Sequence, residues 1–77
     1  MRSNGNIGTP APQSTTTLRN GSIYRVNGRI YQWFDSVGLY ETDTNGTRLV
    51  YSVAGNVELN AVGVIIVNAI VRAYGLA

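Results

Sequence analysis

The chain has 77 residues, of which 44% are hydrophobic, and its formal net charge is +2. It contains neither His nor Cys, which removes the commonest general base and excludes disulfides and thiolate metal sites. This length suffices for one small domain, and so modest a positive charge does not by itself indicate a nucleic-acid partner.

Residues 1–21 are predicted to form a flexible or extended N-terminal arm. Gly, Ser, Thr and Asn crowd the first 17 positions together with both prolines, and Ile7 is the only large aliphatic residue there. Such a composition cannot bury enough apolar surface to form a core. Two interpretations stay open: a loose tail, which the sequence alone favours, and an arm that docks on a neighbouring subunit through Ile7.

Residues 22–54 alternate apolar and polar side chains in short runs, which is typical of β-strands. Two Asn-Gly pairs interrupt these runs, Asn27-Gly28 and Asn45-Gly46. Asn-Gly suits the type I′ turn of a two-residue hairpin, because both central residues need a positive φ. A further turn at residues 35–38 joins the two hairpins, so the sequence predicts a four-stranded antiparallel β-meander.

The two turns also predict which residues face each other. Tyr24 is opposite Tyr31 in the first hairpin, and Asp43 is opposite Arg48 in the second. One face of the sheet then collects these side chains: Tyr24, Val26, Tyr31, Trp33, Tyr40, Leu49, Tyr51 and Val53. The other face is mixed in polarity, and it is too apolar to be wholly exposed to water.

Residues 55–77 are predicted to form an apolar C-terminal helix packed on the sheet or on a partner. Asn56 is a suitable N-cap, and Glu58 in the first turn and Arg72 in the last both suit the helix dipole. Gly75 stands where a left-handed C-cap is wanted. A strand is the competing interpretation, because Val and Ile dominate, but it would be unusually long.

Apolar residues surround most of this predicted helix. The face predicted to cover the sheet consists of Val62, Ile66, Ala69, Ile70 and Ala73. Asn60, Asn68 and Arg72 lie on the other side, interrupted by Val64, Ile65 and Val71. A helix apolar nearly all round is buried in protein or in lipid. Its insertion free energy sums to near zero, and its length is at the short limit for a span, so burial against protein is the preferred interpretation.

No catalytic, cofactor or metal site is predicted. Glu41-x-Asp43-x-Asn45-Gly46 resembles half of a calcium loop, but Ser52 occupies the position where the loop requires an acidic residue. A weak single-stranded nucleic-acid site is a minor alternative. It would use Arg25, Arg29 and Arg48 interleaved with Tyr24, Tyr31, Trp33 and Tyr51.

The sequence therefore predicts an α+β protein with a non-enzymatic, structural role. One helix cannot cover a sheet that is apolar on both faces, so we expect other copies of the chain, or a larger structural protein, to cover the rest. The predicted interface residues are Ile7, Val64, Ile65, Asn68, Val71 and Arg72. A small accessory protein of a virus or phage particle is the expected setting, made in the cytoplasm and residing in the virion. A tail-anchored membrane protein is the alternative.

Overall fold

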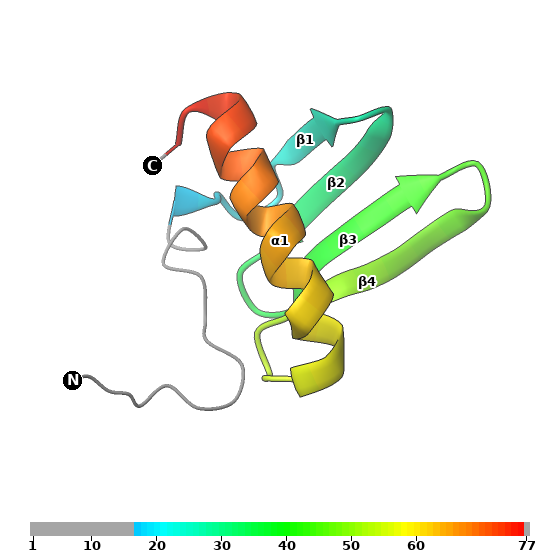
Figure 1. The fold of residues 1–77 in the computed structure, drawn as a ribbon, viewed down its shortest axis with the longest axis vertical. Coiled ribbons are helices and arrows are strands. Elements are labelled where there is room, and N and C mark those ends of the chain that lie inside the picture. Colours follow the sequence, from blue (N-terminus) through cyan, green and yellow to red (C-terminus); the bar gives the residue numbers. More distant parts are fainter. Residues whose placement is uncertain (1–16, 77) are drawn as a thin grey trace.

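A computed structural model describes residues 17–76 and has an α+β fold, as the sequence predicts. Four strands form one antiparallel sheet in the order β1-β2-β3-β4, followed by the single helix α1 (Figure 1). Their bounds are β1 Ile23–Val26, β2 Arg29–Phe34, β3 Gly38–Asp43, β4 Gly46–Ser52 and α1 Val57–Tyr74. The helix lies across one face of the sheet and contacts β4 and the edge strand β1.

The first hairpin has the predicted turn and register. Asn27 and Gly28 both have positive φ, 54° and 76°, as a type I′ turn requires. Val26 pairs with Arg29, and Tyr24 pairs with Tyr31. This turn is determined locally, because few residues other than Asn and Gly occupy both central positions without strain.

The second hairpin differs from the prediction by one residue. Asp43 pairs with Gly46 and Glu41 pairs with Arg48, so Thr44 and Asn45 form the loop instead of Asn45-Gly46. The Asp43 carboxylate accepts a hydrogen bond of 2.8 Å from the Asn45 backbone N–H. This side-chain-to-backbone hydrogen bond stabilises a turn at Thr44 and Asn45, one residue earlier than the predicted turn. The predicted register is wrong for that reason.

β3 is turned over relative to the prediction, because the turn between β2 and β3 spans residues 35–37 instead of 35–38, so that Phe34 pairs with Gly38 and Trp33 with Leu39. One residue fewer in this turn reverses the direction of every side chain of β3, since neighbouring residues of a strand point to opposite faces. Leu39 and Glu41 point toward the helix and are buried. Tyr40, predicted on the covered face, instead pairs with Leu49 and packs against Phe34 on the outer face, with ring centroids 5.9 Å apart. The register of β3 and β4 shifts by one residue between Leu39 and Tyr40, as at a β-bulge. Leu39 therefore pairs with Tyr51, and the Tyr51 side chain points into the core.

The helix ends are those that the sequence predicts. Asn56 is the N-cap, and its side-chain oxygen accepts from the Leu59 N–H at 3.0 Å. Gly75 is the C-cap in the left-handed conformation, with φ 64°. At the same end the Tyr74 hydroxyl accepts a 2.6 Å hydrogen bond from the Arg25 N–H, which ties the helix to the edge strand β1.

The helix presents a different face to the sheet from the one predicted. Its buried residues are Asn60, Gly63, Val67, Ile70 and Val71, whereas Val62 is 62% exposed. Gly63 explains the rotation, because a Cβ there would lie 2.1 Å from the Val50 carbonyl oxygen. Asn60 is buried because its amide bonds both the N–H and the carbonyl of Ser52, each at 2.8 Å.

The core lies between the sheet and the helix. It consists of Leu18, Tyr24, Tyr31, Trp33, Leu39, Tyr51, Val67, Ile70 and Val71. Leu18 belongs to the segment assigned to the arm, yet it is 4% exposed. Gly21 extends the β2 pairing through a 2.7 Å hydrogen bond to the Trp33 carbonyl. Residues 17–21 are therefore part of the packed body, and the arm prediction for residues 1–16 lies outside the described residues.

Candidate interaction surfaces

The outward face of α1 is the most exposed apolar surface of the described chain. Val57, Val62 and Ile65 are exposed by 59%, 62% and 65%, more than any other large hydrophobic side chain in residues 17–76. The Val57–Tyr74 helix has a mean hydropathy of 1.5, and only 28% of it is buried. By length and composition alone it could cross a membrane.

The predicted interface residues separate on this helix. Ile65 and Arg72 are exposed, while Val64 and Asn68 are half-buried. Val71, also predicted at an interface, is 5% exposed and packs in the chain's own core. Ile7 lies outside the described residues. The sequence pattern misplaced Val71 because the whole helix is rotated about its axis by the Gly63 contact.

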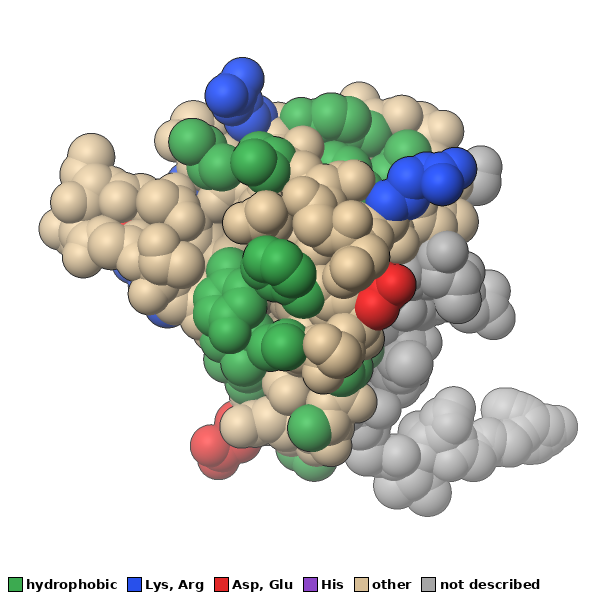
Figure 2. Space-filling view, turned by 180° about the vertical axis from the view of Figure 1, so that it is seen from behind, with side chains coloured by type: hydrophobic (Ala, Val, Ile, Leu, Met, Phe, Trp, Pro, Cys, Tyr) green, Lys and Arg blue, Asp and Glu red, His purple; other side chains and the backbone are tan. Residues whose placement is uncertain are grey.

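The outer face of the sheet is a second apolar surface. Figure 2 shows the side of the molecule opposite the helix, where hydrophobic side chains gather over the centre. The pairing places Ile23, Gln32, Tyr40 and Leu49 in one row across the four strands. Ile23 is 56% exposed, and Tyr40 and Leu49 are half-buried. Tyr40 and Leu49 are predicted on the covered face from the sequence alone, because the predicted turn between β2 and β3 is one residue too long.

The carboxylate of Glu41, on β3, is buried on the face of the sheet that the helix covers. Glu41 accepts a 2.7 Å hydrogen bond from the Tyr31 hydroxyl and a 2.5 Å bond from Arg48. Arg48 also donates to Asp43 at 2.8 Å, and Arg29 lies 3.9 Å from Glu41. The predicted Asp43–Arg48 contact is therefore present, although Arg48 stands opposite Glu41 in the register.

The surroundings of Glu41 perturb two pKa values. The hydrogen bond from Arg48 is the main cause that holds the pKa of Glu41 below its ordinary 4.5. Burial, followed by the hydrogen bond to Glu41, raises the pKa of Tyr31 to about 12. Each carboxylate oxygen of Glu41 already accepts a hydrogen bond, so the group has a structural role as the partner of Tyr31 and Arg48.

Beside this carboxylate is a hollow of about 220 Å³. Its floor is polar, with Tyr31 and Glu41, and its helix wall is apolar, with Ile65, Ile66 and Ala69. From residue 17 to residue 76, no three acidic, His or Cys side chains gather as a metal site would need. The hollow adds a recess to the exposed face of α1.

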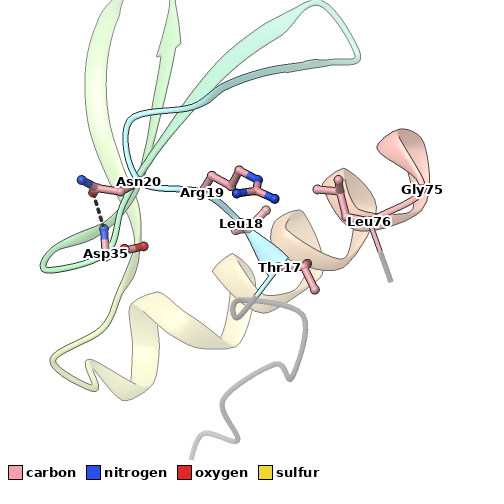
Figure 3. A pocket seen from close by; sticks show the side chains of 7 residues that line it. All are labelled: Thr17, Leu18, Arg19, Asn20, Asp35, Gly75 and Leu76. Atoms are coloured by element: carbon pink, nitrogen blue, oxygen red, sulfur yellow. Dashed lines mark hydrogen bonds between the residues drawn. The ribbon is translucent and has the colours of Figure 1, made fainter.

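A second hollow lies where the described chain begins. It is lined by Thr17, Leu18, Arg19, Asn20, Asp35, Gly75 and Leu76 (Figure 3). Asp35 accepts from the Trp33 indole N–H at 2.7 Å, and its own N–H donates to the Asn20 side chain at 2.9 Å. These groups hold the chain that enters β1 against the β2–β3 turn.

The aromatic side chains considered for nucleic-acid stacking are in the core. Tyr24, Tyr31, Trp33 and Tyr51 are each no more than 6% exposed. Arg48 is engaged by two carboxylates. Bases stack on exposed rings, so the structure removes the platform on which that alternative depends.

Comparison with protein-family models, with curated proteins and with solved structures finds no match to this chain. The two apolar surfaces therefore have to be interpreted from their own chemistry.

Proposed function

We propose that this chain is a non-enzymatic structural subunit that packs into a larger assembly through two surfaces. The first is the exposed face of α1, and the second is the outer face of the sheet. The proposal rests on one observation. Apolar side chains are exposed on both outer sides of the molecule, with Ile65 on the helix side and Ile23 on the sheet side. Virus and phage accessory proteins, such as minor capsid, cement or tail proteins, have this make-up by analogy of type.

Free-energy magnitudes support this proposal. Fully burying a Val or Ile side chain is worth about 1.5–3 kcal/mol, so covering Val57, Val62 and Ile65 offers several kcal/mol to a partner. The described body has about 60 residues, close to the size at which a single core becomes marginal. A partner that covers both surfaces would supply stability that the small core lacks.

The chemical inventory supports a structural role over catalysis. The whole sequence holds four carboxylates and no His or Cys. Glu41 and Asp43, the two that lie close together, share Arg48. A general acid or base needs a free position facing a substrate, and both oxygens of Glu41 are occupied by Tyr31 and Arg48.

A tail-anchored membrane protein is the second candidate, favoured by the length and hydropathy of α1. Two contacts weigh against it. Gly63 fits against the Val50 carbonyl, and Asn60 completes the hydrogen bonding of Ser52 at the end of β4. Insertion of α1 in a bilayer would abandon both contacts and carry the Asn60 amide into hydrocarbon, where unpaired polar groups are costly.

The test is the size of the species that the isolated chain forms. Sedimentation at micromolar concentration is expected to show an oligomer for the wild type. The variant with Ile65→Glu and Ile23→Glu together is expected to shift toward the monomer, because a charge on each surface opposes its burial. Thr44→Glu, at an exposed hairpin tip, is the control and should leave the size unchanged. A dispersed, cooperatively folded wild-type monomer would contradict the proposal.

Liposome flotation separates the membrane alternative. Arg72→Leu removes the main cost of insertion, so on that alternative it strengthens flotation. On the assembly proposal the same change weakens the oligomer. Wild-type flotation that resists carbonate washing and increases in Arg72→Leu, with oligomer size unaffected, would replace the proposal with the tail anchor.

A further inference from the structure

The exposed face of α1 carries opposite charges at its two ends. Glu58 is in the first turn and Arg72 in the last, and neither forms an ion pair with any residue between Thr17 and Leu76. Ile65, 65% exposed, lies seven residues from each. Seven residues are nearly two turns, so the three side chains line up within about 40°, with about 10.5 Å of helix on either side of Ile65.

This line is self-complementary under a two-fold rotation. If a second α1 lies antiparallel, with the two-fold axis at Ile65, then Glu58 faces Arg72 of the partner subunit. The same rotation brings Arg72 against Glu58 of the partner subunit, so two opposite-charge pairs close the ends of one contact. A parallel pair would instead bring Glu58 against Glu58 of the partner subunit, which is repulsive.

The residues between the charges suit close approach. Val62 and Ile65 are exposed and apolar, and Ala61 and Ala69 flank them with small side chains. Glu58, Val62, Ile65, Ala69 and Arg72 follow one another at intervals of four and three, the spacing of a helix-pairing seam. In the antiparallel arrangement Val62 packs beside Ala69 of the partner subunit, a large side chain against a small one.

We propose that α1 is a homodimerisation helix, which pairs antiparallel with α1 of a second copy about a two-fold axis at Ile65. The inference rests on the proposed function, since it names the partner of one of the two surfaces. Complementary charge selects this partner: a lipid surface would leave Glu58 and Arg72, on the centre line of the exposed face, without partners.

Charge reversal tests the pairing. Glu58→Arg alone, or Arg72→Glu alone, turns both attractive pairs repulsive, and the dimer dissociation constant from sedimentation equilibrium is expected to rise about tenfold or more. The double variant Glu58→Arg with Arg72→Glu restores attraction at both ends and should return near the wild-type value. Thr44→Glu, at the exposed tip of the second hairpin, is the control with an added charge away from both surfaces, and should have little effect.

The double variant also controls for helix stability. Each single change opposes the helix dipole, and the double variant opposes it at both ends. Weakening of the helix would therefore make the double variant the worst of the three, whereas pairing makes it the best. Far-UV circular dichroism verifies that all variants are folded.

Cysteine cross-linking tests the orientation, and the chain offers a clean background because it contains no Cys. Ile65→Cys should form an intermolecular disulfide, because the two sulfurs meet at the axis. Glu58→Cys should not cross-link to itself, because its two copies lie about 21 Å apart along the pair. Cross-linking of both variants would establish a parallel pair and overturn the inference.

The outcomes also separate this inference from the proposed function. An oligomer that survives in Glu58→Arg and shows no cross-link at Ile65→Cys would refute the two-fold pair but leave a structural subunit that assembles in another way. A wild-type monomer would refute both. Weakening by either single reversal, recovery in the double variant and a cross-link only at position 65 would establish the antiparallel pair.

Discussion

At the scale of single residues, two buried polar side chains fix how the helix and the sheet pack together. Glu41 and Asn60 are buried, and each is satisfied by named partners: Tyr31 and Arg48 for Glu41, and the Ser52 backbone for Asn60. A buried polar group that loses its partner costs about 1–3 kcal/mol, so these contacts fix how the layers fit together.

Glu41 gives stability a dependence on acid. Its folded pKa lies below the ordinary 4.5 that it regains on unfolding, so in this range the unfolded chain binds more protons. Stability is therefore present above about pH 4.5 and falls as the pH drops further. We expect Glu41→Gln to be less stable than the wild type at pH 7, with a difference that narrows toward pH 3. Urea unfolding across that range measures it, and a constant difference would contradict this role.

Tyr31 gives a dependence on alkali of the opposite sign. Its folded pKa of about 12 is above the ordinary 10, so its contribution is complete below pH 10 and is lost as the pH rises toward 12. Tyr31→Phe should lower stability at pH 7, because it removes one of the two hydrogen-bond donors to the Glu41 carboxylate, and should flatten the loss above pH 10. Tyr51, whose pKa burial also raises, should retain part of that loss. An unchanged alkaline limb would argue against the Tyr31–Glu41 hydrogen bond.

Replacing Gly63 by Ala should change the stability in the direction opposite to the usual one. Replacing Gly by Ala inside a helix ordinarily stabilises it by about 1 kcal/mol. Here the added Cβ would lie 2.1 Å from the Val50 carbonyl oxygen and 2.9 Å from the Tyr51 Cβ, so the helix must move off the sheet. We expect Gly63→Ala to destabilise the fold by about 2 kcal/mol or more in thermal unfolding. Ala61→Gly, at an exposed position of the same helix, measures the effect of an Ala–Gly exchange on stability without that contact. Stabilisation by Gly63→Ala would show that Gly63 packs less closely on Val50 than the structure indicates.

At the scale of elements, the two hairpins show how alike sequences fold differently. Both contain Asn-Gly, but only Asn27 among the described non-glycine residues has positive φ. Asn45 instead donates its N–H to Asp43, and the loop moves back by one residue. The nearby Asp43 therefore sets which residues of β3 and β4 pair, whereas the three-residue turn between Phe34 and Gly38 decides which side chains of β3 face the helix.

The contrast between the hairpins can be measured. Asn27→Ala forces a left-handed conformation on a side chain that disfavours it, so we expect a loss of about 1 kcal/mol. Asn45→Ala keeps the backbone bond to Asp43 and should cost less than half as much. Chemical denaturation of the two variants gives both values, and equal losses would support the register predicted from the Asn-Gly pairs alone. Gly28→Val and Gly46→Val should each cost about 1 kcal/mol or more, since both glycines have positive φ.

At the scale of the whole molecule, the chain is one sheet and one helix with an apolar surface on each outer side. An antiparallel α1 pair would cover the helix side and leave two outer sheet faces, with Ile23 and Tyr40, at the ends of a four-layer dimer. Such a dimer is bivalent, which is a useful property for a subunit that joins larger components.

Truncation tests where the folded body begins. Leu18 is buried among the core residues, so a chain starting at residue 21 loses one core side chain that a chain starting at residue 17 keeps. We expect the shorter chain to be less stable by about 2–5 kcal/mol, the range for removing a buried Leu. Comparison of their melting curves measures the difference, and equal stability would place Leu18 outside the core. Loss of assembly on removing residues 1–16, with the body still folded, would support the arm's predicted role.

The sequence by itself determined the features that depend on neighbouring residues. The Asn27-Gly28 turn, the Asn56 and Gly75 caps, and the number and order of the strands and the helix follow from local backbone preferences, which act over a few residues. The apolar excess on α1 was likewise visible in its composition.

Only the tertiary structure decided the features that depend on distant partners. The rotation of α1 follows from Gly63 meeting Val50, and the burial of Asn60 follows from Ser52 needing partners. Helical periodicity could not reveal either, because apolar residues surround the helix and many rotations bury similar area. Val71 thus belongs to the core, whereas Glu58, Ile65 and Arg72 lie in line on the exposed face, because the contact that selects one rotation is made by a residue without a side chain.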